Sequence, residues 1–285
     1  MKNKRLLIIG VDSFIGSFFY KNFSKTNFKV MGTTKKKTFL QRFNLFEKSK
    51  FNSILTKIDV VIFCSGVSKK LKCKNSRFLS KMINFYLPLQ LFKIIKKKKI
   101  KLIYFSTYDV FDGSKKYVEY NESPSPITEY GKQKLLVETF LKKYFYNAII
   151  IRASKIVSDD LSLIKKWLKD VKNKQKIYPF KNKYLSPVHI FDLYKNVKIL
   201  IKKNKSGLYN LSSDKNYSYY DFILEIVEKC GLDKDLLVPK LSNENVIFNS
   251  FKNEKKKHNY KCKRNNKSHN LFKKLLIVSD HIELG

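Results

Sequence analysis

The sequence predicts an α/β fold with a doubly wound parallel sheet, followed by a smaller C-terminal substrate-binding lobe. Short apolar runs alternate with helical stretches, a pattern typical of parallel strands joined by crossover helices. The first run, Arg5–Ile9, is too short for a helix and resembles a strand buried on both faces. Strands are expected at 6–10, 29–33, 60–64, 102–105 and 148–152, and helices at 14–22, 47–55, 76–97 and 130–144.

The first predicted strand runs directly into a glycine turn of sequence GVDSFIG, which opens a helix. Such a turn lets a ligand approach the backbone, and the helix start offers free N–H groups to a phosphate. An ordinary strand-to-helix turn is the simpler alternative, and serine stands where such motifs usually have their middle glycine. The position directly after a buried strand favours a dinucleotide site, with contacts expected from Gly10, Ser13, Phe14, Ile15 and Gly16.

A tyrosine and a lysine lie four positions apart at Tyr130 and Lys134. On a helix these positions share a face, so both side chains are expected to point into the same space. A nearby ammonium group favours the phenolate and lowers the tyrosine pKa from its usual value of about 10. Tyr130 is therefore a candidate general acid and base. Thr107, which follows the predicted strand 102–105, is expected to hold a carbonyl or hydroxyl oxygen beside it.

Taken in order, these motifs resemble the extended short-chain dehydrogenase/reductases of the nucleotide-sugar epimerase, dehydratase and reductase group. The similarity covers nearly the whole chain and is most like the dTDP-4-dehydrorhamnose reductase family. Dehydratases of the group carry an Asp-Glu pair directly after the threonine, whereas Tyr108 and Asp109 stand here, which leaves reduction or epimerisation. The similar segments are Gly10–Gly16, Val60–Gly66, Ser106–Gly113, Tyr130–Lys134, Ser186–Leu193 and Gly207–Ser212.

The resemblance implies a Rossmann fold and a catalytic set of Thr107, Tyr130 and Lys134. Hydride would pass between a nicotinamide and a carbon of a nucleotide sugar, while Tyr130 moves the matching proton and Lys134 binds the nicotinamide ribose. Further cofactor contacts are expected from Thr33, Lys35, Asn44, Ser65 and Gly66, and substrate contacts from Ser106, Asn84 and Lys183.

The end of the second predicted strand bears on the choice of cofactor. An acidic residue there accepts hydrogen bonds from the ribose 2′-hydroxyl of NAD and repels a 2′-phosphate. The chain has Thr33 and Thr34 at this point, followed by the cations Lys35–Lys37 and no acid. NADP(H) is therefore expected rather than NAD(H).

The net charge of +37 raises the question of nucleic acid binding. Lysine is spread along the whole chain and arginine is rare, although readers of bases favour arginine forks. Lys, Asn, Ile, Phe and Tyr are the residues that A/T-rich codons specify, so codon bias explains the composition without a nucleic-acid partner. The four scattered cysteines form no Cys-x-x-Cys pair, so neither a metal site nor a disulfide framework is predicted.

A Rossmann domain is expected over residues 1–155, with 188–207 returning to it. Residues 156–187 and 208–285 would form the small lobe, in which the polar stretch 253–270 is expected to be a mobile loop. No segment approaches the ~20 apolar residues that span a bilayer, so a cytoplasmic protein is expected. Its assembly, if it is not a monomer, is expected to be a homodimer.

Two other classes of protein remain open at this point. One is a non-catalytic Rossmann-fold protein that binds RNA through its basic surface, which the complete set of Thr107, Tyr130 and Lys134 disfavours. The other is an assembly subunit that retains only the fold, and failure to bind any dinucleotide would indicate it.

Overall fold

The computed structural model describes residues 4–36, 40–158, 162–213, 215–243 and 248–252. The predicted loop 253–270 lies outside the described residues. The chain divides into two compact units. Residues 112–123, which were expected in the first unit, belong to the second, and the segment that returns to the first unit is Lys198–Asn210, where 188–207 was expected. The first unit comprises Met1–Phe111, Pro124–Arg152 and Lys198–Asn210, and the second comprises Asp112–Ser123, Ala153–Val197 and Leu211–Gly285.

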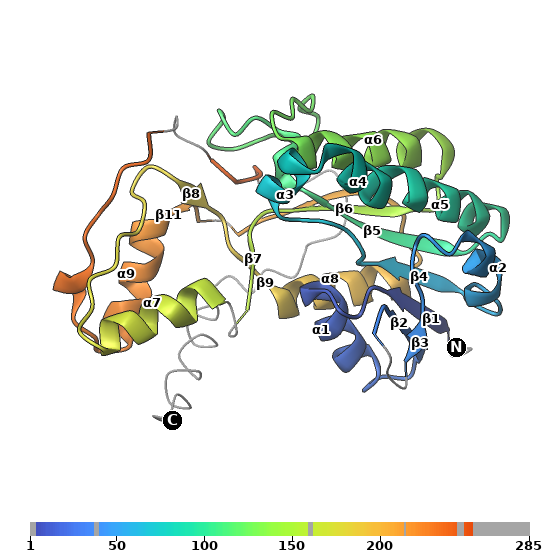
Figure 1. Cartoon of the computed structure of the whole chain (residues 1–285), viewed down its shortest axis with the longest axis horizontal. Coiled ribbons are helices and arrows are strands. Elements are labelled where there is room, and N and C mark those ends of the chain that lie inside the picture. Colours follow the sequence, from blue (N-terminus) through green and yellow to red (C-terminus); the bar gives the residue numbers. More distant parts are fainter. Residues whose placement is uncertain (1–3, 37–39, 159–161, 214, 244–247, 253–285) are drawn as a thin grey trace. The chain divides into compact units, whose positions relative to one another are not determined.

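The first unit is built on a seven-stranded sheet in the order β10-β6-β5-β4-β1-β2-β3 (Figure 1). β1 pairs in parallel with β2 on one side and with β4 on the other, so the chain crosses over twice from the centre of the sheet. This order confirms the predicted doubly wound parallel sheet. The strands are β1 (Arg5–Ile9), β2 (Lys29–Thr34), β3 (Gln41–Arg42), β4 (Val60–Phe63), β5 (Lys101–Thr107), β6 (Ile149–Ala153) and β10 (Gly207–Leu211).

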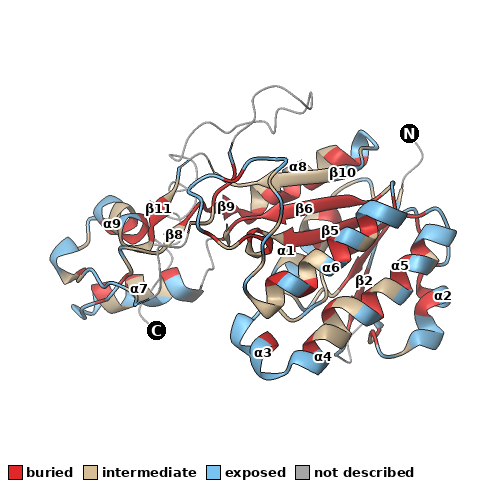
Figure 2. Cartoon of the chain, turned by 90° about the horizontal axis from the view of Figure 1, so that it is seen from above, coloured by how far each residue is buried: buried red, intermediate tan, exposed pale blue. Residues whose placement is uncertain are grey.

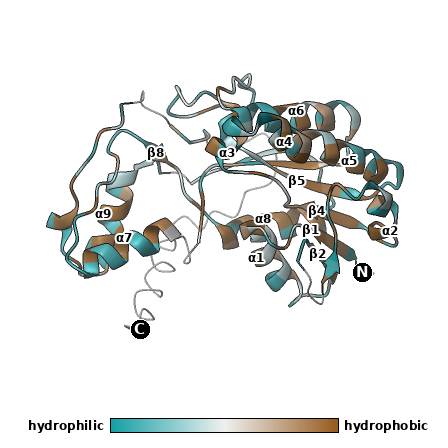
Figure 3. Cartoon of the chain, viewed as in Figure 1, coloured by the Kyte–Doolittle hydropathy of each residue, from teal (hydrophilic) through white to brown (hydrophobic). Residues whose placement is uncertain are grey.

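The central strands are apolar because helices cover the sheet on both faces. Every residue of β4 is buried, as are the first six residues of β5, and Figure 2 shows β5 in red. Figure 3 shows the same strands as hydrophobic, while the helices carry both kinds of residue. Continuous apolar runs of this kind are the signature of parallel strands.

Helices α5 (Leu87–Lys97) and α6 (Glu129–Tyr144) lie on one face of the sheet and α1 (Phe14–Phe23) on the other (Figure 1). The single helix predicted at 76–97 is instead a succession of α4 (Arg77–Lys81), a π-helical turn η2 (Met82–Tyr86) and α5. The helix predicted at 47–55 consists of two short turns. The remaining elements of this stretch are η1 (Lys48–Lys50), α2 (Phe51–Ile54), α3 (Lys70–Asn75) and η3 (Tyr108–Val110).

The second unit has its own core between two helices, α7 (Ser162–Lys172) and α9 (Tyr219–Lys229). Ser218 begins α9, because its hydroxyl accepts the N–H of Asp221 at 2.9 Å. Two small sheets complete the unit, with β7 parallel to β9 and β8 antiparallel to β11. Its other elements are β7 (Ile156–Val157), β8 (Tyr184–Leu185), β9 (Val188–His189), β11 (Tyr217–Ser218) and η4 (Lys234–Leu236), while α8 (Ile190–Lys202) begins in the second unit and ends in the first.

None of the helices within the described ranges is both long enough and apolar enough to cross a membrane. The described part of the chain also contains no cluster of three or more His, Cys, Asp or Glu side chains that is arranged to hold a metal ion.

Candidate dinucleotide-binding and catalytic site

The glycine turn after β1 brings two backbone segments so close together that only glycine fits. Gly10 has a φ of +90°, and a Cβ on it would lie 2.9 Å from the N atom of Ser65. A Cβ on Gly16 would lie 2.2 Å from the carbonyl oxygen of Gly10. The turn therefore leaves open backbone at the start of α1, as a phosphate cradle requires.

Ser13, which replaces the middle glycine, fastens this turn. Its Oγ donates to the carbonyl oxygen of Gly10 at 2.8 Å and accepts the N–H of Gly16 at 3.0 Å, so it caps α1. Phe14 and Ile15 occupy the first turn of α1, where backbone N–H groups lack partners within the helix. Ser13 therefore stabilises the phosphate cradle, although it stands where such motifs usually have a glycine.

The glycine turn is hydrogen-bonded to the end of β2. The Gly10 N–H donates to Thr33 Oγ1 at 3.2 Å, and the Val11 N–H donates to the Thr33 carbonyl oxygen at 2.9 Å. Thr33 was predicted to contact the cofactor, but it is 1% exposed and holds the turn in place instead. The end of β2 has no acidic residue of its own, but the carboxylate of Asp12 lies there. It accepts hydrogen bonds from the Thr34 hydroxyl and from the Lys35 N–H. Asp12 was not predicted to reach this point, because it lies in the glycine turn, 22 positions before Thr34.

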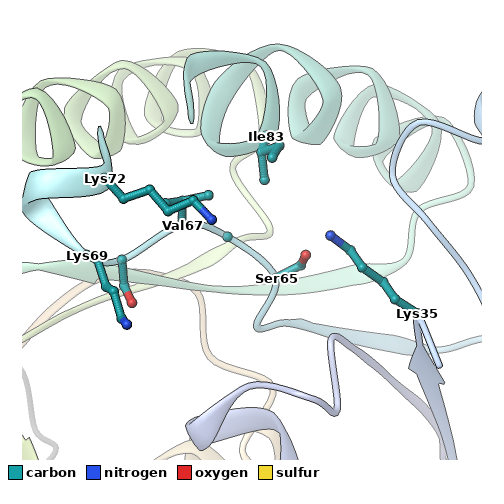
Figure 4. A pocket seen from close by; sticks show the side chains of 8 residues that line it. Lys35, Ser65, Val67, Lys69, Lys72 and Ile83 are labelled. Atoms are coloured by element: carbon teal, nitrogen blue, oxygen red, sulfur yellow. The ribbon is translucent and has the colours of Figure 1, made fainter. Parts of the chain in front are cut away.

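A cavity of about 340 Å³ opens beside the turn. It brings together three predicted cofactor residues, Lys35, Ser65 and Gly66. In Figure 4, Lys35 from the end of β2 and Lys72 from α3 point into the cavity from opposite sides. This cationic lining suits a phosphate-bearing ligand. The lining residues that were not predicted are Val67, Ser68, Lys69, Lys72 and Ile83, most of which directly follow Gly66.

Two predicted ligand contacts are not among the residues that line this cavity. Asn44 forms a local turn in which its Oδ1 accepts the Phe46 N–H at 3.3 Å. Lys183 belongs to the second unit, where its Nζ lies 4.9 Å from the centroid of the Phe180 ring.

Tyr130 and Lys134 lie in the first turns of α6, which Thr128 caps by accepting the Gly131 N–H at 3.0 Å. As the spacing predicts, they share a face, with Lys134 Nζ 5.8 Å from the centroid of the Tyr130 ring. Lys134 Nζ donates to the carbonyl oxygen of Phe105 at 2.8 Å and lies over the Tyr104 ring. Burial lowers the pKa of Lys134 to about 8.

The pKa of Tyr130 is raised in this structure, whereas the sequence predicted that Lys134 would lower it. Burial is the main cause, and the electrostatic influence of Asp109, and of Cys73 once its thiol ionises, adds to it. The ammonium of Lys134 is directed at the carbonyl oxygen of Phe105, so it does not offset them. An activated Tyr130 therefore requires a change in its surroundings, such as an altered partner for Lys134 or a second donor to the phenol.

Thr107 lies at the end of β5 and accepts the N–H of Asp109 at 3.2 Å. Its hydroxyl also donates to Asp109 Oδ2 at 3.3 Å, and Asp109 Oδ1 pairs with Lys70 Nζ at 2.5 Å. The candidate catalytic threonine therefore lies beside a carboxylate that forms an ion pair with Lys70.

Ser106 and Asn84 were predicted to bind substrate, but both face the interior. The Ser106 hydroxyl donates to the buried carboxylate of Glu138. Asn84 is 4% exposed, its Oδ1 accepts the Val67 N–H at 2.7 Å, and its Nδ2 donates to Gln133 Oε1 at 2.7 Å. Asn84 thus joins the loop that lines the cavity to the helix that carries Tyr130, and it acts as a positioning residue.

The fold, the glycine cradle and the Tyr–Lys pair define an oxidoreductase of the extended short-chain dehydrogenase/reductase type. The chain belongs to the RmlD substrate binding domain family, whose model matches residues 4–250. This finding confirms the resemblance to dTDP-4-dehydrorhamnose reductases.

Individual relatives agree with this assignment. The chain is 23% identical over 244 residues to the probable low-salt glycan biosynthesis reductase Agl14 of Haloferax volcanii, covering 81% of each chain. It is 26% identical over 185 residues to the spore coat polysaccharide biosynthesis protein SpsK of Bacillus subtilis, covering 63% of this chain and 64% of that one. The solved structure of dTDP-4-dehydrorhamnose reductase from Bacillus anthracis, in complex with NADP, superimposes with a TM-score of 0.80 at 20% identity, covering 88% of this chain and 90% of that chain.

Proposed function

We propose that this protein is an NADP(H)-dependent reductase of a nucleotide-activated sugar. The observation that carries the proposal is the cationic cavity of Lys35, Ser65 and Gly66 beside the glycine turn. Relatives named as a glycan biosynthesis reductase and a dTDP-4-dehydrorhamnose reductase favour reduction over epimerisation. The absence of an acid in the Lys35–Lys36 stretch after β2 favours NADP(H).

The residues present fit a dinucleotide, because a Cβ at Gly10 or Gly16 would fill the cradle that a diphosphate needs. When bound, a reduced nicotinamide supplies the hydride for reduction of a carbonyl group. The chain supplies the open backbone at the start of α1 and the ammonium of Lys35 for phosphate groups. Lys134 would exchange the carbonyl oxygen of Phe105 for a ribose hydroxyl.

Tyr130 would deliver the proton that the reduced oxygen needs. The phenol is protonated at neutral pH, as a proton donor must be, but its raised pKa makes it a weak acid, so the bound cofactor and substrate must lower that pKa for efficient transfer. Thr107 would hold the same oxygen through its hydroxyl. Asn84 keeps α6 and the cavity loop in register, so that donor and cavity stay together.

The first test replaces Tyr130 with phenylalanine. NADPH oxidation should be followed with a panel of nucleotide 4-keto sugars, beginning with dTDP-4-dehydrorhamnose. Loss of the phenol oxygen should lower turnover by roughly 10² to 10⁴, while NADPH affinity stays within a few-fold. Tyr146→Phe is the control, since Tyr146 is 88% exposed. A Tyr130→Phe enzyme that keeps half of its activity would refute the role of Tyr130.

The second test uses the lowered pKa of Lys134, whose charged form is present below about pH 8 and is lost above it. If the ammonium holds the ribose, NADPH affinity should fall as the pH rises through this value. Lys134→Met should bind NADPH more weakly, by roughly 1.5–3 kcal/mol, and should show no such step. Lys132→Met, at an exposed position of the same helix, is the matched control. Equal affinities and equal pH profiles for the two variants would contradict the proposed role of Lys134.

A further inference from the structure

The carboxylate of Asp12 lies at the end of β2, although Asp12 belongs to the glycine turn. Thr34 Oγ1 approaches its two oxygens at 2.7 and 2.8 Å, and the Lys35 N–H donates to Oδ2 at 3.0 Å. Thr34 is buried and lies 22 positions beyond Asp12 in the sequence. The carboxylate is therefore held against the strand end by a fixed hydroxyl and a backbone donor.

This strand end has a known significance in dinucleotide-binding folds. An acidic residue about 20 positions after the glycine turn binds the ribose 2′-hydroxyl and discriminates against a 2′-phosphate. Here the corresponding stretch holds Thr33 and Thr34, neither of which carries a charge. A carboxylate is nevertheless present at this point, because the Asp12 side chain reaches the end of β2 from the glycine turn.

Asp12 is charged and accessible. Burial on its own raises the pKa of Asp12, but the Lys35 N–H, the Thr34 hydroxyl and the ammonium groups of Lys36 and Lys35 together hold it below its usual value. The residue as a whole is exposed. An ionised carboxylate in this position accepts hydrogen bonds from sugar hydroxyls and repels a phosphate dianion.

We propose that Asp12 selects the cofactor: its carboxylate binds the free 2′-hydroxyl of an adenosine ribose and opposes a 2′-phosphate. This inference deepens the proposed function and rests on it. Lys35 acts in the opposite direction, since its side chain lines the cavity and attracts phosphate. Because the two charges compete, the preference of the unaltered chain for NADPH is smaller than the cations after β2 alone would give.

The test measures the dissociation constants of NADPH and NADH by nicotinamide fluorescence at one moderate ionic strength. Asp12→Asn keeps the size of the side chain and one acceptor oxygen but removes the charge. It should shift the ratio of the two constants toward NADPH by about tenfold. Lys35→Met should shift the ratio toward NADH. Glu228→Gln, on the exposed side of α9, removes the same charge elsewhere and should leave the ratio unchanged.

A second variant separates the selection of the cofactor from support of the turn. Thr34→Val removes the hydroxyl that fixes Asp12 and keeps every charge, so it should shift the ratio in the same direction by less. Thermal unfolding identifies any variant that does not fold. An unchanged ratio in Asp12→Asn, whether both constants move or neither does, would overturn the proposal and leave Asp12 as a support of the turn. If the unaltered chain bound neither dinucleotide, the proposed function itself would fail, and this inference with it.

Discussion

Helix α6 carries two ion pairs of nearly equal length in opposite surroundings. Near its start, Glu129 accepts from Arg77 at 2.6 Å, and the Arg77 side chain is 70% exposed. In its second half, Glu138 accepts from Arg152 at 2.7 Å, and the two side chains are 0% and 1% exposed. The two pairs therefore have nearly the same N–O distance and differ in how far their side chains are exposed to solvent.

Solvent decides what each pair contributes to stability. At the surface, water and salt screen the attraction, so such pairs contribute little. In the interior, each charge has lost its hydration and depends on its partner. Glu138 accepts three hydrogen bonds from Arg152 and one from Ser106, and Arg152 also lies over the ring of Phe111. The buried pair is therefore a site where removing one partner is costly.

The largest effect is expected from Glu138→Gln, which leaves Arg152 charged and without a counter-ion. The free energy of unfolding should fall by roughly 3–5 kcal/mol, measured by urea denaturation. The double variant Glu138→Leu, Arg152→Met removes both charges and should recover most of the loss. A loss in Glu138→Gln no larger than that of a surface variant would break the comparison.

A smaller effect is expected from Asn84→Ala, because the buried network that it disrupts is uncharged. The variant leaves Val67 and the Gln133 side chain without their partner, at a cost of roughly 1–3 kcal/mol. It should also weaken NADPH binding, since it releases the loop that lines the cavity. Asn52→Ala on α2 is an exposed control and should leave both quantities unchanged. If Asn84→Ala altered stability but not binding, the network would have no part in positioning the cavity.

The smallest effect is expected from Arg77→Ala. Water solvates the Arg77 guanidinium and still reaches the Glu129 carboxylate, whose side chain is 18% exposed, so the urea midpoint should stay within experimental error at low and at high salt. A clear loss of stability that persists in high salt would show that the pair behaves as a buried one. That result would mean that the helix start is less accessible than the structure indicates.

Much of the first unit could be predicted from the sequence because its signals are local. β1 and β4 are continuous apolar runs, and the glycine turn and the Tyr130–Lys134 spacing occupy a few consecutive positions. Asp12 was missed because its meeting with Thr34 depends on how β1 and β2 pair, which no local pattern encodes.

The buried polar contacts could not be predicted either, because they also join residues that are far apart in the sequence. Ser106 was predicted to bind substrate, because no residue near it in the sequence indicates that Glu138 lies beside it. The second unit was harder still, since its strands are only two residues long and pair across wide gaps in the sequence, such as Tyr217 with Leu185. The chemistry of Tyr130 could be predicted only in part. The sequence predicted that Lys134 lies beside it, but not that the ammonium points at the carbonyl oxygen of Phe105.

The π-helical turn at Met82–Tyr86 means that the chain carries one residue more here than a regular helix would need. Removing a single residue from this turn should restore an ordinary helix, and because the turn itself accommodates the extra residue, the side chains within Met82–Tyr86 should change direction while α4 and α5 keep theirs. Asn84 would then lose its position opposite Val67 and Gln133. The length of this segment, and not only its residues, is therefore part of what joins the cavity to the helix of Tyr130.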